Sequence, residues 1–166
     1  MNILKYLILV ALIVVTGACD SMNKHMDNEA LVARYVEAVE TQDFEMMEAI
    51  LSDDYIGYGP SAGDSISKIG ALEKWEMFSN ELYENIEYIR AEYAGIRIRE
   101  GENKGYWVAT WAELNIEYHG ERGAASIWAN TNYKVENGKI VKSYTFYNEA
   151  DVLRQLGWVF INPNNL

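Results

Sequence analysis

Glu113 is the carboxylate whose surroundings in the sequence best suit acid/base chemistry. It shares one face of an expected strand with Trp107 and Trp111, because alternate residues of a strand point the same way. A carboxyl group placed among aromatic rings has a raised pKa, which suits proton transfer near neutral pH. If this face instead meets solvent or a second copy, Glu113 is an ordinary exposed acid.

The other residue types that commonly do chemistry form no recognisable site. His25 falls in a polar segment and His119 in an expected turn, so no His, Cys and carboxylate cluster has the spacing of a metal site. Asp53 and Asp54 are adjacent at a corner, where their side chains point apart and suit turns or caps. The sequence lacks a nucleophile elbow, a phosphate loop and a dinucleotide fingerprint. We therefore expect no metal, no cofactor and no nucleophilic catalysis.

Composition favours one globular domain with more aromatic surface than a minimal core needs. The chain has 166 residues, of which 49% are apolar and 13% aromatic, including five Trp and twelve Tyr. Some of these rings are candidates for the wall of a pocket. The net charge of −11 argues against nucleic acid and against an anionic membrane face as partners.

The first residues are typical of a bacterial secretion signal, expected over 1–18. Lys5 precedes an apolar run from Tyr6 to Val15, which is shorter than the ~20 residues that a spanning helix needs. The small residues before Cys19 resemble the lipobox of bacterial lipoproteins, in which the cysteine becomes the lipid-modified first residue. The alternative is a free thiol, since a single cysteine forms no intrachain disulfide. We expect a tether over 19–27 and a location at the cell envelope, lipid-anchored or periplasmic or secreted.

The segment up to Pro60 predicts two helices followed by a strand. The apolar residues of the first helix recur at i, i+3, i+4 and i+7: Val32, Tyr35, Val36 and Val39. Asp43 is placed to cap a second helix that carries Leu51 on its apolar face. The residues 52–54 are expected to end that helix, and a strand over 55–58 leads to Gly59 and Pro60.

The remainder predicts a third helix over 65–83, a run of long strands and a short final helix over 150–156. The apolar period changes to two, as in strands, over five segments: 86–93, 96–99, 106–118, 124–136 and 139–148. Gly95 is expected to form a bulge, and Asn137-Gly138 a tight hairpin. Helices followed by an antiparallel meander predict one α+β domain over 28–158 with a tail over 159–166.

Several short pieces, in this order and spacing, resemble the nuclear transport factor 2-like superfamily and most of all its SnoaL-like branch. They are Arg34-Tyr35-Val36-Glu37-Ala38, Asp43-Phe44, Ser52-Asp53-Asp54, Gly59-Pro60, Asn137-Gly138-Lys139-Ile140-Val141 and Leu153-Arg154-Gln155-Leu156-Gly157. The resemblance implies a cone in which three N-terminal helices pack against a strongly curved, mostly antiparallel sheet, with a short C-terminal helix. This fold hosts isomerases, cyclases, dehydratases, hydrolases and binding modules, so it does not fix the function.

The resemblance also implies roles for individual positions. Tyr35 is similar to the tyrosine of ketosteroid isomerase that donates a hydrogen bond to the enolate oxygen. Gly59 stands before Pro60 where that isomerase has its aspartate base. SnoaL-like cyclases carry His or Asp on the final strand, where this chain has Thr145 and Asn148. These neutral groups orient a ligand but do not titrate near neutral pH.

Side chains from elements that converge in this fold are expected to line a cavity. They are Tyr35, Tyr58, Trp75, Phe78, Trp107, Trp111, Tyr133, Thr145, Tyr147 and Asn148. The first hypothesis is a lipid-anchored domain that binds a small apolar or aromatic molecule without turning it over. The alternatives are an acid/base enzyme using Tyr35 and Glu113, a structural role at the envelope, and a filled core without any cavity. A sheet that is partly apolar on both faces also predicts a homodimer through its outer face, with Trp111 and Trp128 as candidate contacts.

Overall fold

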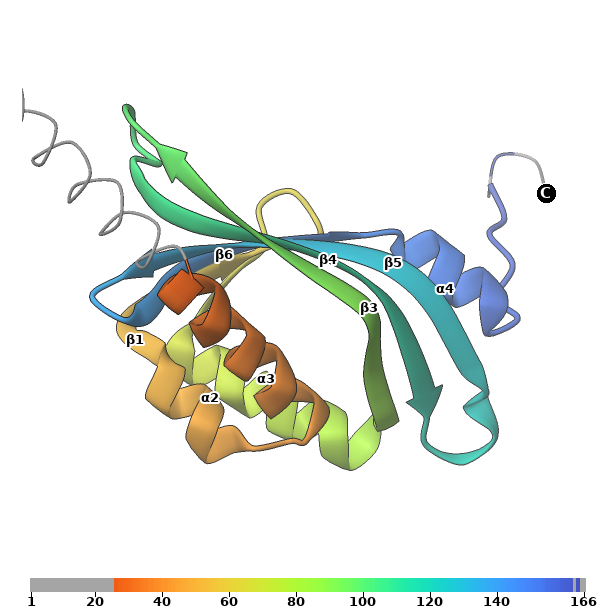
Figure 1. Ribbon diagram of the computed structural model, residues 1–166. Helices are drawn as coiled ribbons and strands as arrows, with labels where there is room; N and C mark the ends of the chain where they lie inside the picture. Colours follow the sequence, from red (N-terminus) through yellow and green to blue (C-terminus); the bar gives the residue numbers. More distant parts are fainter. Residues whose placement is uncertain (1–25, 163, 165–166) are drawn as a thin grey trace, which may run out of the picture.

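A six-stranded sheet curves around helices that pack on its concave side (Figure 1). The structure is a computed structural model that describes residues 26–162 and 164. After a first helix over 26–40, the elements are α2 (Phe44–Ile50), β1 (Leu51–Tyr58), β2 (Ser65–Ser67), α3 (Lys68–Glu81), β3 (Tyr83–Ile98), β4 (Gly105–Tyr118), η1 (Gly120–Arg122), β5 (Ala124–Glu136), β6 (Lys139–Tyr147) and α4 (Glu149–Gln155). The strand order is β2-β1-β6-β5-β4-β3, with β1 and β6 parallel and the other neighbours antiparallel. The predicted α+β cone is confirmed.

The first two helices form where the apolar spacing and the cap predict them. All four residues of the predicted stripe on the first helix are buried in the core. Asp43 caps α2, because its carboxylate accepts a hydrogen bond from the Met46 amide at 2.8 Å. The Asn137-Gly138 hairpin is also confirmed, since both residues have the positive φ that this turn requires.

The first helix also covers the free edge of the sheet. Glu40 accepts a hydrogen bond from the Tyr88 amide at 2.6 Å, and Glu29 accepts one from the Gly95 amide at 2.7 Å. Both amides belong to β3, the edge strand, whose outward N–H groups otherwise invite pairing with another chain. Two glutamates of one helix therefore cap this edge.

Three predicted element boundaries were wrong. Leu51 was expected on α2 but begins β1, where it pairs with Ile140 of β6 and is buried. The residues 65–67 were expected to open the third helix but form β2, and the Ser67 side chain caps α3 by accepting from the Gly70 amide. Residues 26 and 27 were expected in the tether but are helical. In the first two cases a strand pairing with the rest of the sheet outweighs the local sequence signal.

The bend of β3 occurs at Arg90 and not at Gly95. The register shifts between the Ile89–Glu113 and Glu92–Trp111 pairs, and Arg90 has a φ of 54°. Gly95 instead pairs in regular register with Val108. A bulge adds one residue to a strand and increases its local twist, so this bulge helps the sheet curl around the helices.

No helix among residues 26–162 is long and apolar enough to cross a membrane. The expected secretion signal, His25 and Cys19 lie outside the described residues.

Candidate functional site

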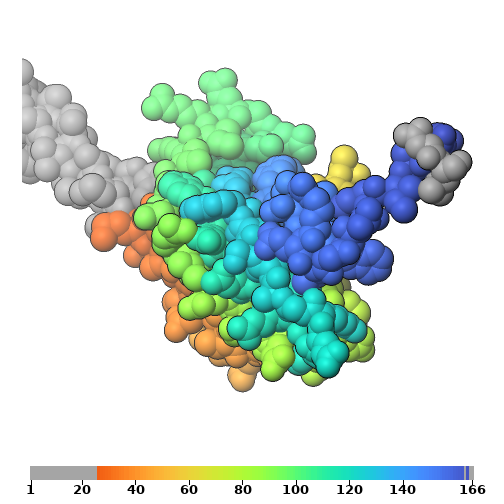
Figure 2. Space-filling model, turned by 90° about the vertical axis from the view of Figure 1, so that its right-hand side faces the viewer, coloured from red at the N-terminus to blue at the C-terminus, as the bar shows by residue number. Residues whose placement is uncertain are grey.

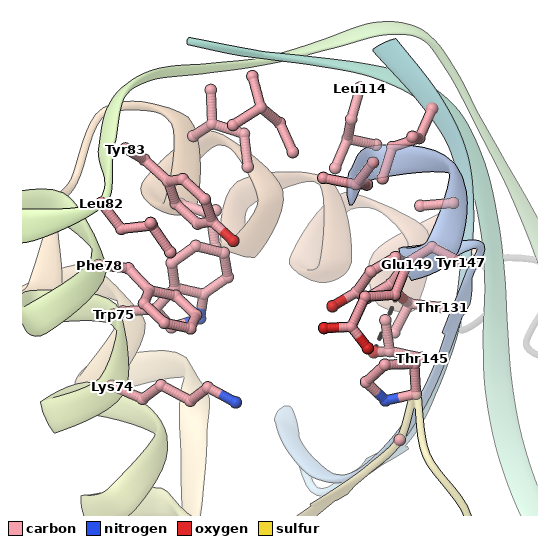
Figure 3. A pocket seen from close by; sticks show the side chains of 18 of the residues that line it. Lys74, Trp75, Phe78, Leu82, Tyr83, Leu114, Thr131, Thr145, Tyr147 and Glu149 are labelled. Carbon is pink, nitrogen blue, oxygen red and sulfur yellow. Dashed lines mark hydrogen bonds between the residues drawn. The ribbon is translucent and has the colours of Figure 1, made fainter. Parts of the chain in front are cut away.

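A cavity of about 700 Å³ opens between the concave face of the sheet, the first helix, α3 and α4. Its volume falls in the range of ~300–1,000 Å³ that small-molecule sites usually occupy. Figure 3 shows α3 side chains on one wall and residues of β5, β6 and α4 on the opposite wall. The predicted cone is therefore hollow, and its interior is not filled completely by side chains.

Most of the side chains expected at the cavity do line it. They are Tyr35, Trp75, Phe78, Tyr133, Thr145 and Tyr147. Tyr58 borders the cavity, but its ring stacks at 5.0 Å on Tyr144, whose side chain lies on the outer face of the sheet. Trp75 and Phe78 project from α3 and face Thr145 and Tyr147 across the open space (Figure 3). The ring centroids of Trp75 and Phe78 are 6.0 Å apart at an interplanar angle of 90°. This edge-to-face contact gives the α3 wall a fixed shape.

The prediction for Glu113, Trp107 and Trp111 chose the wrong face of β4. The cavity is lined by the even-numbered residues of this strand, including Thr110 and Ala112. Alternate residues of a strand point to opposite faces, so the odd-numbered residues lie on the outer, convex face. Glu113 is not at the cavity and forms an ion pair there with Arg90.

The two tryptophans of this set have different surroundings. Trp107 is buried beneath the β3–β4 loop, where its indole nitrogen donates to the Asn103 carbonyl at 2.8 Å and its ring stacks on Tyr144. Trp111 is exposed on the outer face. Asn148 also lies away from the cavity lining, because it caps α4 by accepting from the Asp151 amide at 3.2 Å.

Neutral phenols form the inner part of the cavity. Tyr35, Tyr55 and Tyr133 are all buried, and the rings of Tyr35 and Tyr133 meet edge to face at 5.8 Å. Burial raises the pKa of each of these three phenols above its ordinary value, most strongly for Tyr35 and Tyr133, and a hydrogen bond with Trp75 only partly opposes this for Tyr35. The phenols therefore stay protonated at neutral pH and offer O–H donors to a bound molecule.

All three hydroxyls have a side-chain partner: Trp75 for Tyr35, Thr131 for Tyr133, and Ser143 on the neighbouring β6 for Tyr55, at 2.7 Å. The indole N–H of Trp75 can only donate, so the hydroxyl proton of Tyr35 remains free for a ligand. Gly57 makes room for the Tyr55 hydroxyl, since a side chain at that position would begin 2.6 Å from the Tyr55 oxygen. Tyr55 was not among the predicted lining residues, although it precedes Gly57 by two residues and so shares its face of β1.

Charged side chains occur at the mouth of the cavity. Lys74, Glu121, Arg122 and Glu149 are its charged lining residues, and all four are exposed. Lys74 and Glu149 stand on opposite sides of the opening (Figure 3). No group of three His, Cys, Asp or Glu side chains in the described part of the chain is arranged to hold a metal ion. The charged side chains therefore lie at the rim of the cavity, and the hydroxyl groups that can form hydrogen bonds lie at its inner end.

The position before Pro60 has no space for a catalytic side chain. Gly59 has a φ of +96°, and a Cβ atom there would lie 2.3 Å from the carbonyl oxygen of Thr145. Real Cβ atoms do not approach backbone oxygens so closely, so any larger residue requires a shift of β6. The absence of a carboxylate at this position therefore follows from the packing of the chain against β6.

The comparisons with known proteins agree with this fold. Residues 32–143 match the model of the SnoaL-like domain. A candidate polyketide cyclase from Xanthomonas campestris has a TM-score of 0.65 at 15% identity, covering 80% of this chain and 98% of that one. An LEH-like epoxide hydrolase of M. tuberculosis has a TM-score of 0.60 at 16% identity, covering 80% and 91%.

A third solved structure is a protein from Catenulispora acidiphila with a ketosteroid isomerase-like fold, in complex with trimethylamine. It has a TM-score of 0.59 at 11% identity and covers 78% of this chain and 97% of that one. No curated protein matches the chain significantly. The TM-scores of these three structures show a shared fold, and the match to the family model covers most of the cone. The chain belongs to the SnoaL-like domain family.

Proposed function

We propose that this domain binds a small, largely apolar molecule in its cavity and does not convert it. The observation that carries this proposal is the composition of the lining: aromatic and aliphatic walls, neutral hydroxyls at depth, and carboxylates only at the rim among the described lining residues. Apolar walls supply most of the binding free energy, and a few polar groups orient the ligand.

The tyrosines further specify the ligand as an uncharged molecule with a hydrogen-bond acceptor at its inner end. Tyr35 and Tyr133 present phenolic donors that stay protonated, and a carbonyl oxygen is a matching acceptor. An ionised group at that depth would lose its hydration without an opposite charge to pair with, which is costly. A neutral ketone or quinone-like ring system therefore fits this end of the cavity.

An acid/base enzyme that uses Tyr35 and Glu113 receives no support from the geometry. Tyr35 lines the cavity, whereas Glu113 lies on the outer face of β4 and is paired with Arg90. A general base must come within hydrogen-bond reach of the proton that it removes. The lining carboxylates Glu121 and Glu149 are both exposed at the mouth of the cavity, whereas the phenols lie at its inner end.

Removing the Tyr35 hydroxyl is expected to weaken the binding of ligands that carry a carbonyl group, and not the binding of hydrocarbons. A Tyr35→Phe variant should bind the fluorescent ketone prodan about 3–10-fold less tightly than the parent protein, as loss of one hydrogen bond predicts. Binding of the hydrocarbon probe diphenylhexatriene should be unchanged. Fluorescence titration of both probes provides the measurement. Equal losses for both probes would show that the change acts through shape and not through the hydroxyl.

Two matched variants complete this experiment. Tyr55→Phe should weaken prodan binding less, because the Tyr55 hydroxyl can donate to Ser143, whereas Tyr35 accepts from the Trp75 indole and keeps its proton free for the ligand. Ala112 and Ala129 are cross-strand partners that both line the cavity, so the double change Ala112→Trp and Ala129→Trp should abolish binding of both probes. If the parent protein binds neither probe, or the double variant still binds both, the proposed function is wrong.

We also propose that the domain is held at the cell envelope through a lipid on Cys19. The support is the apolar leader and the small residues before the only cysteine of the chain. A Cys19→Ala variant is expected to move from the membrane fraction to the soluble fraction when it is expressed in the native host. Mass spectrometry of the processed parent chain should show an acylated cysteine. A variant that still sediments with membranes would contradict the lipid anchor.

The outer face of the sheet is proposed to join two copies of the domain. Trp111, Trp128 and Phe146 are exposed there on β4, β5 and β6, and they are close in register. Exposed aromatic side chains gathered in one patch are typical of protein interfaces. Replacing Trp111 and Trp128 with serine should convert a dimer into a monomer in light-scattering chromatography. An unchanged mass for this variant would contradict the proposed interface.

A further inference from the structure

Four large apolar side chains lie exposed in succession just after α4. Trp158, Val159, Phe160 and Ile161 have exposed fractions of 65%, 79%, 59% and 62%. We refer to residues 158–161 as the apolar tail. It projects away from the body of the domain in two perpendicular views (Figures 1 and 2). Large apolar side chains concentrated on a protein surface mark a site of interaction.

The apolar tail starts at the mouth of the cavity. Trp158 is one of the lining residues, together with Leu153 and Leu156. The end of α4 fixes this position, because Gly157 has a φ of 85° and the Trp158 amide donates to the Leu153 carbonyl at 2.9 Å. Whatever binds the apolar tail therefore lies next to the opening of the cavity.

We propose that the apolar tail inserts into the surface of an uncharged lipid bilayer. A segment that packs on a protein as a strand buries alternate residues and leaves the others in water. All four successive residues of the apolar tail are apolar. A lipid phase that surrounds the segment can therefore bury all four side chains, whereas a protein surface on one side can bury only alternate ones. Tryptophan and phenylalanine are well suited to the boundary between lipid and water.

Charge supports uncharged lipid as the partner. The sequence from 158 to 166 contains no Asp, Glu, Lys or Arg, so insertion places no charged side chain of this segment in hydrocarbon. The whole chain carries a net charge of −11, so an acidic lipid surface repels it and adds no electrostatic attraction. Apolar contact is therefore the attractive interaction.

Insertion at this point would bring the cavity mouth to the bilayer. An apolar ligand dissolved in the membrane would then reach the cavity without crossing bulk water, where its solubility is low. This consequence rests on the proposed function of the cavity. The insertion itself does not, because it depends on the apolar tail alone.

A site-specific label on the apolar tail tests the proposal. In a Cys19→Ala background, the environment-sensitive fluorophore NBD is attached to an Ile161→Cys variant and mixed with phosphatidylcholine vesicles. Emission should rise several-fold as the label leaves water, and the added changes Val159→Asp and Phe160→Asp should abolish the rise. Vesicles that also contain phosphatidylglycerol should give no larger response.

The matched control carries the same label at an Ile69→Cys variant. Ile69 is 69% exposed on α3, comparable with Ile161, and its label should not respond to vesicles. Both labelled chains have the same N-terminal segment, so any lipid affinity of that segment affects them equally. No response at 161, or an equal response at 69, would overturn the proposal.

Two other outcomes would assign the apolar tail elsewhere and also overturn the proposal. Emission that rises with protein concentration without vesicles would indicate docking on a second copy. High emission from the dilute protein alone would indicate that the apolar tail folds into its own cavity. Because prodan binding is measured in vesicle-free solution, failure of the proposed function is seen separately from failure of membrane insertion.

Discussion

Above pH 10 the folded domain is expected to lose stability steeply, and three phenols of the cavity alone contribute about 4 kcal/mol per pH unit. Burial raises the pKa of Tyr35, Tyr55 and Tyr133 above the ordinary value of 10.0, and it also raises the pKa of Tyr83 and Tyr88, which adds to the slope. Below pH 10 the folded and unfolded chains both keep these protons, so the full stability is present. Above pH 10 the unfolded chain releases them and the folded chain retains them, which favours unfolding. Each retained proton contributes about 1.4 kcal/mol per pH unit.

Urea unfolding measured by circular dichroism at a series of alkaline pH values provides the test. A Tyr133→Phe variant has one buried phenol fewer, so its slope should be smaller than that of the parent protein by about 1.4 kcal/mol per pH unit. Any offset in its stability at neutral pH does not enter the slope. A parent slope no steeper than that expected for one phenol would show that the tyrosines are less well buried than the structure indicates.

Replacing Gly59 with alanine is expected to destabilise the domain by about 4 kcal/mol. The positive φ of +96° strains any residue other than glycine, and the new Cβ atom would meet the Thr145 carbonyl oxygen at 2.3 Å. Thr145 pairs with Thr131 in β6–β5 register, so relief of the contact requires movement within the sheet. Chemical denaturation monitored by tryptophan fluorescence measures the loss.

Gly63 offers a control with nearly the same backbone conformation. Its φ is +93°, and a Cβ atom there meets nothing within 4 Å. Gly63→Ala should therefore cost only the conformational strain, about 1 kcal/mol. Equal losses for the two variants would show that strain, and not the contact with Thr145, makes glycine necessary before Pro60. The comparison thus tests why this domain cannot carry a base at that position.

The helices and strands of the cone were predictable because their signals are local. The apolar spacing of the first helix, the Asp43 cap and the Asn137-Gly138 turn each act over a few residues. The errors occurred where residues distant in the sequence determine the local secondary structure. Leu51 joins a strand because Ile140 lies beside it, and the bulge at Arg90 depends on its register with β4.

The site was predicted in part for a related reason. Tyr35, which was placed by family position, lines the cavity, and so do Trp75 and Tyr133, which were chosen because their elements converge in this fold. Glu113 was chosen by alternation alone, and alternation groups residues by face without saying which face is concave. The register with β5 supplies that information, because Val108 pairs directly with Tyr133 and so fixes the even-numbered residues of β4 on the inner face.

The capping of β3 by Glu29 and Glu40 has a consequence for how the chain is made. Both glutamates precede β3 in the sequence, so the ribosome completes the first helix before the strand that it covers. An unpaired edge strand is most prone to aggregate while a chain is still incomplete. The order of synthesis therefore makes the protecting helix available when the vulnerable edge emerges, which lowers the risk of strand exchange between neighbouring nascent chains.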